Sequence, residues 1–233
     1  MKALRGFICI CGMLGHMMSK LMVWVAYIAE VFADVSLATY AAACIIFFFI
    51  GAIPFGPIIA RIKRVDLKKI GSGNIGATNV YRALGFKWAA LVFALDALKG
   101  AACAFAGLTT YHAGMPAGLL GIFAVLGHIF SPFLKFRGGK GVATGFGVMA
   151  VFAPIPALIT LTIWGALVSW KKLVSLASII AAIALPALVA AFKGPGWIFY
   201  TSLIVVGLVI LSHWENILRL MRGQEKPVQR KKS

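Results

Sequence analysis

The 233-residue chain is 61% hydrophobic and only 12% charged, with a mean hydropathy of +0.95. Soluble domains are roughly half apolar and a quarter charged, so this composition excludes a soluble globular protein and predicts an all-α, polytopic membrane protein. The formal net charge of +17 suits membrane lipids or an anionic small-molecule substrate. We do not expect a nucleic-acid partner.

Residues 1–36 begin with a short apolar run, Phe7–Met18, behind Lys2 and Arg5. This pattern is typical of a signal peptide, and the run is shorter than the roughly 20 residues that a membrane span needs. We predict an N-terminal extension over residues 1–36 and assign it no function.

Seven apolar segments follow, and we predict each of them as a membrane span. They cover approximately residues 37–60, 88–111, 115–134, 141–153, 155–170, 173–192 and 197–213. The fourth is short and begins in a Gly-rich stretch, so it could be re-entrant or partly exposed. We therefore expect one seven-helix membrane domain over 37–226, followed by a basic tail over 227–233.

The basic residues predict the orientation. If the loop 61–87 is cytoplasmic, alternation of the spans puts segments 135–140, 171–172 and 214–233 on the same side. The four segments hold seven, three, two and six Lys and Arg, which is 18 of the 23 in the chain. Because cytoplasmic loops carry the excess of basic residues, we expect all of the polar segments, and the C-terminus, to face the cytoplasm.

The first polar segment is the glycine-rich stretch Gly71–Asn79, which Arg82 and other basic residues flank. Its glycines let the backbone turn tightly and point successive N–H groups at one anion. It predicts a phosphate site, and the alternative is a solvated loop whose glycines only make turns. A dinucleotide site is excluded, because no strand precedes the Gly-x-Gly-x-x-Gly pattern.

The second polar segment, Phe136–Thr144, contains Gly138-Gly139-Lys140-Gly141. The ammonium of Lys140 could lie beside backbone N–H groups aimed at the same oxygens. It is not a Walker A loop, because Gly141 stands where Ser or Thr is required. The alternative is a basic interfacial loop that snorkels to lipid phosphates. His128 ends the preceding apolar segment and could orient this loop.

The third polar segment begins at His213, and Asn216 and Arg219 follow it at helical spacing, so that one face could present all three. The alternative is the solvated end of the last helix. Within a span, Asp96 and Lys99 stand at i and i+3, which fits either a structural salt bridge or a catalytic pair.

No protein nucleophile is visible, since the chain has no Gly-x-Ser-x-Gly elbow and no His with Asp five positions later. An enzyme with this sequence needs a donor that is already activated, and it would work by positioning and charge neutralisation. The four cysteines lie in apolar runs and predict neither a disulfide framework nor a structural metal.

Three stretches in this order resemble one family: Ser72–Asn79, Gly138–Thr144 and His213-x-x-Asn216-Ile217-x-Arg219-Leu220. They are similar to the three signatures of the acyl-phosphate-dependent glycerol-3-phosphate acyltransferases of the PlsY type. The resemblance implies a seven-helix enzyme of the bacterial inner membrane. It would transfer a fatty acyl group from acyl-phosphate to the 1-hydroxyl of sn-glycerol 3-phosphate, giving lysophosphatidic acid and phosphate without a cofactor or metal.

The resemblance also implies site residues. The catalytic residues would be Ser72, Lys140, His213 and Asn216. The phosphate-binding residues would be Gly73, Asn74, Gly76, Ala77, Thr78, Asn79, Arg82, Gly138, Gly139, Lys140, Gly141 and Thr144. Glycerol 3-phosphate would be oriented by Ser178, His213, Asn216, Arg219 and Glu225. The general base is either His213 or the phosphate of the substrate, and the acyl chain would lie in an apolar groove between helices.

The main alternative function is a transporter or flippase for a phosphorylated metabolite or lipid. Such a protein usually carries polar groups near the bilayer midplane and an internal repeat, and the sequence shows neither.

Overall fold

The structure is a computed structural model that describes residues 22, 36–111 and 114–228. The chain divides into two compact units, Met1–Ala42 and Ala43–Ser233. The second unit contains all three polar segments and is described below. The predicted extension over residues 1–36 lies almost entirely outside the described residues.

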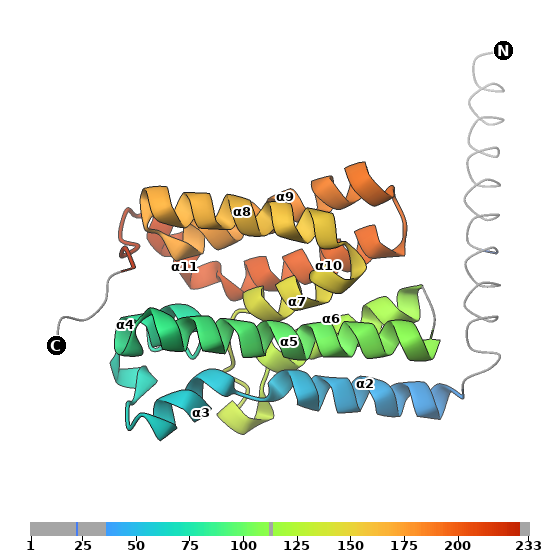
Figure 1. Cartoon of the computed structure of the whole chain (residues 1–233), viewed down its shortest axis with the longest axis horizontal. Helices are drawn as coiled ribbons and strands as arrows, with labels where there is room; N and C mark the ends of the chain where they lie inside the picture. The colour runs from blue at the N-terminus through green and yellow to red at the C-terminus, as the bar shows by residue number, and fades with distance from the viewer. Residues whose placement is uncertain (1–21, 23–35, 112–113, 229–233) are drawn as a thin grey trace, which may run out of the picture. The chain divides into compact units, whose positions relative to one another are not determined.

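Every regular element in the described part of the chain is a helix (Figure 1). The α-helices are α2 (Leu37–Ala52), α3 (Phe55–Ile62), α4 (Ala77–Leu84), α5 (Phe86–Tyr111), α6 (Met115–Ile129), α7 (Val142–Phe152), α8 (Pro154–Lys171), α9 (Val174–Lys193), α10 (Trp197–Ser212) and α11 (Trp214–Met221). Two short 3₁₀ helices, η1 (Leu67–Lys69) and η2 (Pro132–Leu134), lie in the connections.

The prediction of an all-α membrane protein is confirmed, and helices occupy all seven predicted ranges. Among the described residues, length and composition qualify four stretches as spans: Leu37–Ile62, Phe86–Tyr111, Met115–Leu134 and Val174–Lys193. The pair α10 and α11 makes a fifth if its 61° bend is counted within one span. Helix α7 has only 11 residues, as the Gly-rich start of its range suggested, so a total of seven crossings stays a prediction.

The first span contains a break that the predicted range 37–60 did not include. Pro57 has no N–H, so the carbonyl of Ile53, four residues before it, has no helical partner. Side chains from other parts of the fold bond to the carbonyls at this break: Lys99 Nζ of α5 donates to Ile53 O (2.8 Å), and Ser131 Oγ, which follows α6, donates to Ala52 O (2.7 Å). The polar backbone at the break is therefore satisfied inside the protein, as a membrane requires.

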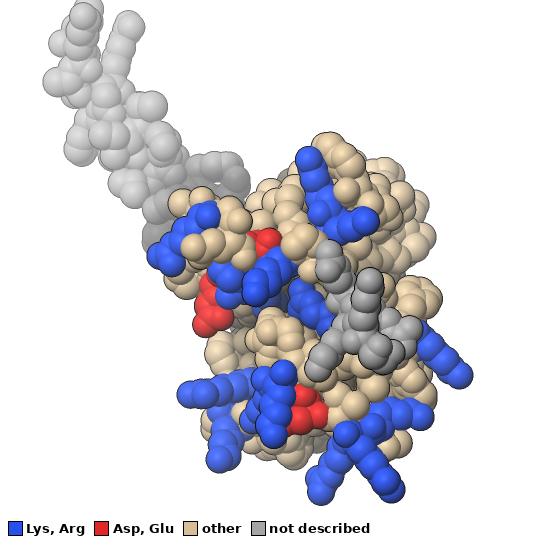
Figure 2. All heavy atoms as spheres, turned by 90° about the vertical axis from the view of Figure 1, so that its left-hand side faces the viewer, with Lys and Arg blue, Asp and Glu red and all other residues tan. Residues whose placement is uncertain are grey.

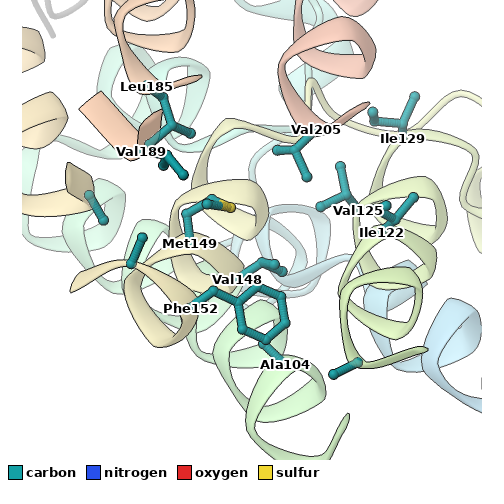
Figure 3. Packing of buried hydrophobic residues seen from close by; sticks show 13 residues of the cluster. Ala104, Ile122, Val125, Ile129, Val148, Met149, Phe152, Leu185, Val189 and Val205 are labelled. Carbon is teal, nitrogen blue, oxygen red and sulfur yellow. The ribbon is translucent and has the colours of Figure 1, made fainter. Parts of the chain in front are cut away.

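Helix α7 lies at the centre of the main core. Val148, Met149 and Phe152 of this helix pack among Val125 of α6 and Val205 of α10 (Figure 3). Gly147 and Gly100 allow α7 and α5 to approach closely, because a Cβ on either would overlap a backbone carbonyl of the other helix. Such small residues at crossings are what close helix packing in a membrane needs.

Lys and Arg side chains gather at one end of this unit, the end where α4 and α11 lie (Figures 1 and 2). Figure 2 views that end directly and shows few acidic groups among the basic ones. All three polar segments contribute to it, so the fold collects in space what the sequence separates by more than 140 residues between Gly71 and Asn216.

Candidate active site

The carboxylate of Glu225 is the point at which several site residues meet. After α11, Gly223 adopts a left-handed conformation (φ 65°) that turns the chain back. Two backbone bonds hold the returning segment: Gln224 N donates to Arg219 O (2.8 Å), and Val228 N donates to Lys172 O (2.7 Å). The side chain of Glu225 is thereby placed against α9 and α11.

Three side chains donate hydrogen bonds to Glu225. Ser175 Oγ (2.7 Å) and Asn216 Nδ2 (2.6 Å) donate to Oε1, and Arg219 Nε (2.7 Å) donates to Oε2. Burial raises the pKa of Glu225, but these three hydrogen bonds outweigh it and hold the pKa below its ordinary value. Glu225 is therefore a carboxylate at neutral pH.

Glu225 and its three partners, Ser175, Asn216 and Arg219, form the Glu225 cluster. Lys140 joins the second polar segment to this cluster. Its ammonium donates a hydrogen bond to Oδ1 of Asn216, whose amide nitrogen is bonded to Glu225. Burial lowers the pKa of Lys140 to about 8, although the charge of Glu225 works against this effect. Lys140 is thus still mostly a cation at pH 7, and it lies close to losing its proton.

Arg82, in the last turn of α4, brings the first segment to the same place. Burial lowers its pKa, the charge of Glu225 raises it and the charge of Arg219 lowers it. Arg82 therefore lies within electrostatic range of both residues. Three cations, Arg82, Lys140 and Arg219, are thus within electrostatic range of one another, against two carboxylates, Glu225 and the exposed Glu215. The excess positive charge suits a phosphate, which Arg binds bidentately and Lys binds as a point charge.

The glycine-rich segment holds its shape through local bonds. Gly71 (φ 56°) and Gly73 (φ 69°) are left-handed, and Asn74 Oδ1 accepts from Gly76 N (2.9 Å). The N–H of Asn74 donates to Ser72 Oγ (3.4 Å). Helix α4 then starts at Ala77, and the first N–H groups of a helix have no partner within it. Ala77 and Thr78 therefore offer donors where phosphate binding is expected.

Asn79 is placed differently from its neighbours. Its side chain is buried, and Nδ2 donates to Leu67 O (2.9 Å). This bond fixes η1 against α4, so Asn79 has a structural task. Its role in phosphate binding stays a prediction.

Gly138 and Gly139 do not aim their N–H groups at the Glu225 cluster. Gly138 N donates to Ile129 O (2.9 Å) and Gly139 N donates to His128 O (3.0 Å). Thr144 is completely buried, and Gly141 (φ 76°) is the residue just before α7. Of this segment only Lys140 contacts the cluster through an identified bond, and the phosphate-binding roles of the other residues stay predictions.

His213, at the turn between α10 and α11, is buried, and its Nδ1 lies 2.8 Å from Val209 O. A carbonyl can only accept, so Nδ1 carries a proton and Nε2 is the remaining polar atom of the ring. His213 lies within electrostatic range of Lys140 and Glu225.

Two serines of α9 lie on the side of the site. Ser178, which is predicted to orient glycerol 3-phosphate, accepts a hydrogen bond from Trp164 Nε1 (3.1 Å), and its role stays a prediction. Ser175, one helical turn earlier, makes the bond to Glu225 and was not among the predicted site residues. Both stand on one helical face, so spacing alone could not choose between them.

An apolar cavity, open on one side, lies beside the cluster between α5, α7, α8, α9 and α10, and it encloses about 590 Å³ when its open mouth is included. Phe93, Phe146, Met149, Trp164 and Leu185 are among its lining residues. It reaches the polar site, because Val142, two residues after Lys140, and Val209, whose carbonyl contacts His213, also line it.

Among the described residues, no group of three or more His, Cys, Asp or Glu could hold a metal ion.

Comparison with known proteins identifies the family. Residues 41–223 match the family model described as glycerol-3-phosphate acyltransferase. The glycerol-3-phosphate acyltransferase of Aquifex aeolicus is 42% identical over 181 residues, which cover 76% of this chain and 93% of the relative. Glycerol-3-phosphate acyltransferase 1 of Deinococcus radiodurans is 42% identical over 191 residues, 82% of this chain and 96% of the relative.

The fold of this chain is similar to two crystal structures of PlsY (YgiH), an integral membrane glycerol 3-phosphate acyltransferase. The glycerol 3-phosphate form has a TM-score of 0.77 at 39% identity and covers 82% of this chain and 96% of the other. The lysophosphatidic acid form has a TM-score of 0.76 at 39% identity, with coverages of 81% and 94%. These findings confirm the resemblance seen in the three polar segments. The chain belongs to the glycerol-3-phosphate acyltransferase family.

Proposed function

We propose that this glycerol-3-phosphate acyltransferase takes its acyl group from a fatty acyl-phosphate and transfers it to the 1-hydroxyl of sn-glycerol 3-phosphate. The products are lysophosphatidic acid and inorganic phosphate. The observation that carries the proposal is the convergence of Arg82, Lys140 and Arg219 on Glu225 at the edge of an apolar cavity. The cations suit phosphates, and the cavity suits an acyl chain.

In the reaction, the glycerol oxygen attacks the acyl carbonyl carbon while the bond from that carbon to the phosphate oxygen breaks. An acyl-phosphate is a mixed anhydride with a good leaving group, so no covalent enzyme intermediate is required. Arg82 and Lys140 neutralise the phosphates, and the α4 N-terminus with Ser72 and Thr78 holds one of them. His213 and Asn216 orient the glycerol hydroxyls, while Ser175, Arg219 and Glu225 keep Asn216 in place.

The phosphate of the substrate takes the hydroxyl proton, and His213 orients the hydroxyl. His213→Ala then lowers the rate, but the wild-type pH profile shows no limb that belongs to this residue. The measurement is kcat/KM against pH for both proteins. A limb that is present in the wild type and vanishes in His213→Ala would make His213 the base.

The basic end of the protein faces the cytoplasm of a bacterial cell, in the inner membrane. The support is the positive-inside rule together with the gathering of Lys and Arg at the end that carries the site (Figure 2). Membrane lipids surround the apolar helices, and glycerol 3-phosphate arrives from the cytoplasm.

The test is phosphate release from palmitoyl-phosphate by the purified protein in detergent, with and without glycerol 3-phosphate. We expect release that needs both substrates and is lost in Lys140→Ala. Glu215→Ala is the matched control, because this exposed carboxylate lies 3.8 Å from Arg219 Nη1 without belonging to the cluster. No release by folded protein, together with uptake of glycerol 3-phosphate into proteoliposomes, would favour the transporter alternative instead.

A further inference from the structure

We propose that His128 is a positioning residue: its ring supports the backbone of Gly139 and thereby holds the ammonium of Lys140 at the Glu225 cluster. The inference rests on the proposed function, since that function assigns Lys140 to a phosphate. His128 itself touches none of the cluster residues through an identified bond.

The loop that carries Lys140 is attached to the end of α6. The last carbonyls of a helix have no partner within it, and here those of His128 and Ile129 accept from Gly139 N (3.0 Å) and Gly138 N (2.9 Å). Lys140 is the next residue, and its ammonium contacts Asn216. The position of the α6 end therefore determines where the Lys140 side chain starts.

One edge of the His128 ring lies directly against Gly139. A Cβ on Gly139 would be 2.9 Å from Cε1 and 3.0 Å from Cδ2 of His128, and closer still to Nε2. No side chain fits there while the ring is present. At Gly138 the obstacle is different, because a Cβ would overlap the backbone carbonyls of His128 and Ile129.

The opposite side of the ring faces a buried ion pair. Nδ1 of His128 lies 3.6 Å from Asp96 Oδ1, which is an electrostatic contact and longer than a hydrogen bond. Asp96 is paired with Lys99 (2.7 Å), and Lys99 donates to Ile53 O at the break in the first span. Because His128 is 5% exposed and flanked on both sides, its ring is fixed in one orientation. Asp96 and Lys99 thus act as support for this ring.

The two neighbouring glycines test whether the His128 ring is in direct contact with the Gly139 backbone, and the kinetics of the His128 variants test whether that contact positions Lys140. Removing the ring leaves room for a Cβ on Gly139, and it leaves the overlap at Gly138 unchanged. The two neighbouring glycines therefore form a matched pair, in which only substitutions at Gly139 are coupled to His128.

The experiment measures kcat and KM for both substrates in Gly139→Ala, Gly138→Ala and His128→Ala, and in each glycine variant combined with His128→Ala. We expect each single variant to lose at least about ten-fold in kcat/KM. The Gly139→Ala, His128→Ala double variant recovers at least about five-fold over Gly139→Ala, since contacting residues are strongly coupled. The Gly138→Ala, His128→Ala double variant shows no recovery.

Gly165→Ala is the control for the glycine substitutions, because a Cβ there meets nothing within 4 Å. Thermal unfolding of every variant identifies those that fail to fold. His128→Gln, which reaches about as far as Nε2, provides a second test. We expect His128→Ala to raise the KM for glycerol 3-phosphate more than it lowers kcat, and Gln to restore most of that loss.

The inference is overturned if the folded Gly139 double variant shows no recovery, or if the two glycines recover equally. If Gly139→Ala does not fold, the His128 variants decide. The inference is then overturned if His128→Ala has unchanged kinetics, or if His128→Gln is no more active than His128→Ala. A wild-type protein without phosphate release overturns the proposed function and this inference together. An active wild type without the recovery overturns only the inference.

Discussion

The glycine-rich segment and the Glu225 cluster both suit phosphate, but they are built in different ways. Gly71, Gly73 and Asn74 shape the first through left-handed turns and local bonds to backbone. The second depends on side chains from different helices that meet at one carboxylate. We infer that the glycine-rich segment is sensitive to shape, and that the cluster is sensitive to charge.

Glu225→Ala tests the cluster with the largest expected effect. It removes the acceptor of three hydrogen bonds, from Ser175, Asn216 and Arg219, so we expect about a 100-fold loss of kcat/KM, as for other preorganised polar groups in active sites. Glu215→Ala removes the other carboxylate near Arg219, and the side chain of Glu215 is 88% exposed. Exposed pairs contribute little, so we expect a change within about two-fold. Equal losses in the two variants would contradict the central place of Glu225.

The pH dependence tests the charge of Lys140. Its pKa is lowered to about 8, so Lys140 is a cation below pH 8 and loses its proton as the pH rises through that value. Since the substrate phosphate has a second pKa near 6, it is already a dianion there. We expect kcat/KM to fall by about ten-fold per pH unit above the pKa of Lys140. Lys140→Arg should remove this limb, and a limb that persists in this variant would belong to another group.

Gly71→Ala tests the shape of the glycine-rich segment. Gly71 has φ 56°, and a Cβ there would lie 2.6 Å from Asn79 Oδ1 and 2.7 Å from Arg82 Cδ. Left-handed backbone alone costs roughly 1–2 kcal/mol for a residue with a Cβ. We therefore expect about a ten-fold rise in the KM of a phosphate substrate, with little change in its pH profile. Gly207→Ala, whose Cβ meets nothing within 4 Å, should behave as the wild type.

Asn74→Ala carries the smallest expected effect. It removes the acceptor for the N–H of Gly76 just before α4, and losing one hydrogen bond of this kind costs about 1 kcal/mol. We expect kcat/KM to fall by about two- to five-fold, and Asn74→Asp to keep most of the activity because it keeps the acceptor oxygen. If Asp were as poor as Ala, the amide group itself would be needed, and charge would matter in this segment as well.

The sequence located the polar segments because residues such as Arg82, Lys140 and Asn216 stand out against an apolar chain. It could not show which side chains meet, since contacts between residues far apart in the chain leave no local pattern. For this reason the sequence could not show that Ser175, and not Ser178, contacts Glu225. Glu225 was expected among the residues that orient glycerol, but its central place depends on the turn at Gly223, and the glycine was the available signal.

The break in the first span was not predicted, although Pro54 and Pro57 were the signal that could have shown it. Lys99 and Ser131 donate to carbonyls at this break, and no local pattern relates residues so far apart in the chain. Asp96 and Lys99 were compatible with a salt bridge or with catalysis, and the structure places them as a buried pair beneath His128. Their position follows from the packing of α5 on its neighbours, which no spacing rule predicts.

The 61° bend at His213 separates an apolar helix from a polar one. Before it, α10 is an apolar helix; after it, α11 carries Glu215, Asn216 and Arg219. A donor that partitions into the bilayer would reach the site from the lipid side, and the enzyme would respond to its mole fraction in the surface. Glycerol 3-phosphate would be sensed as an ordinary concentration in water. Diluting the donor with inert lipid should therefore slow the reaction even when the total amount of each reactant stays constant.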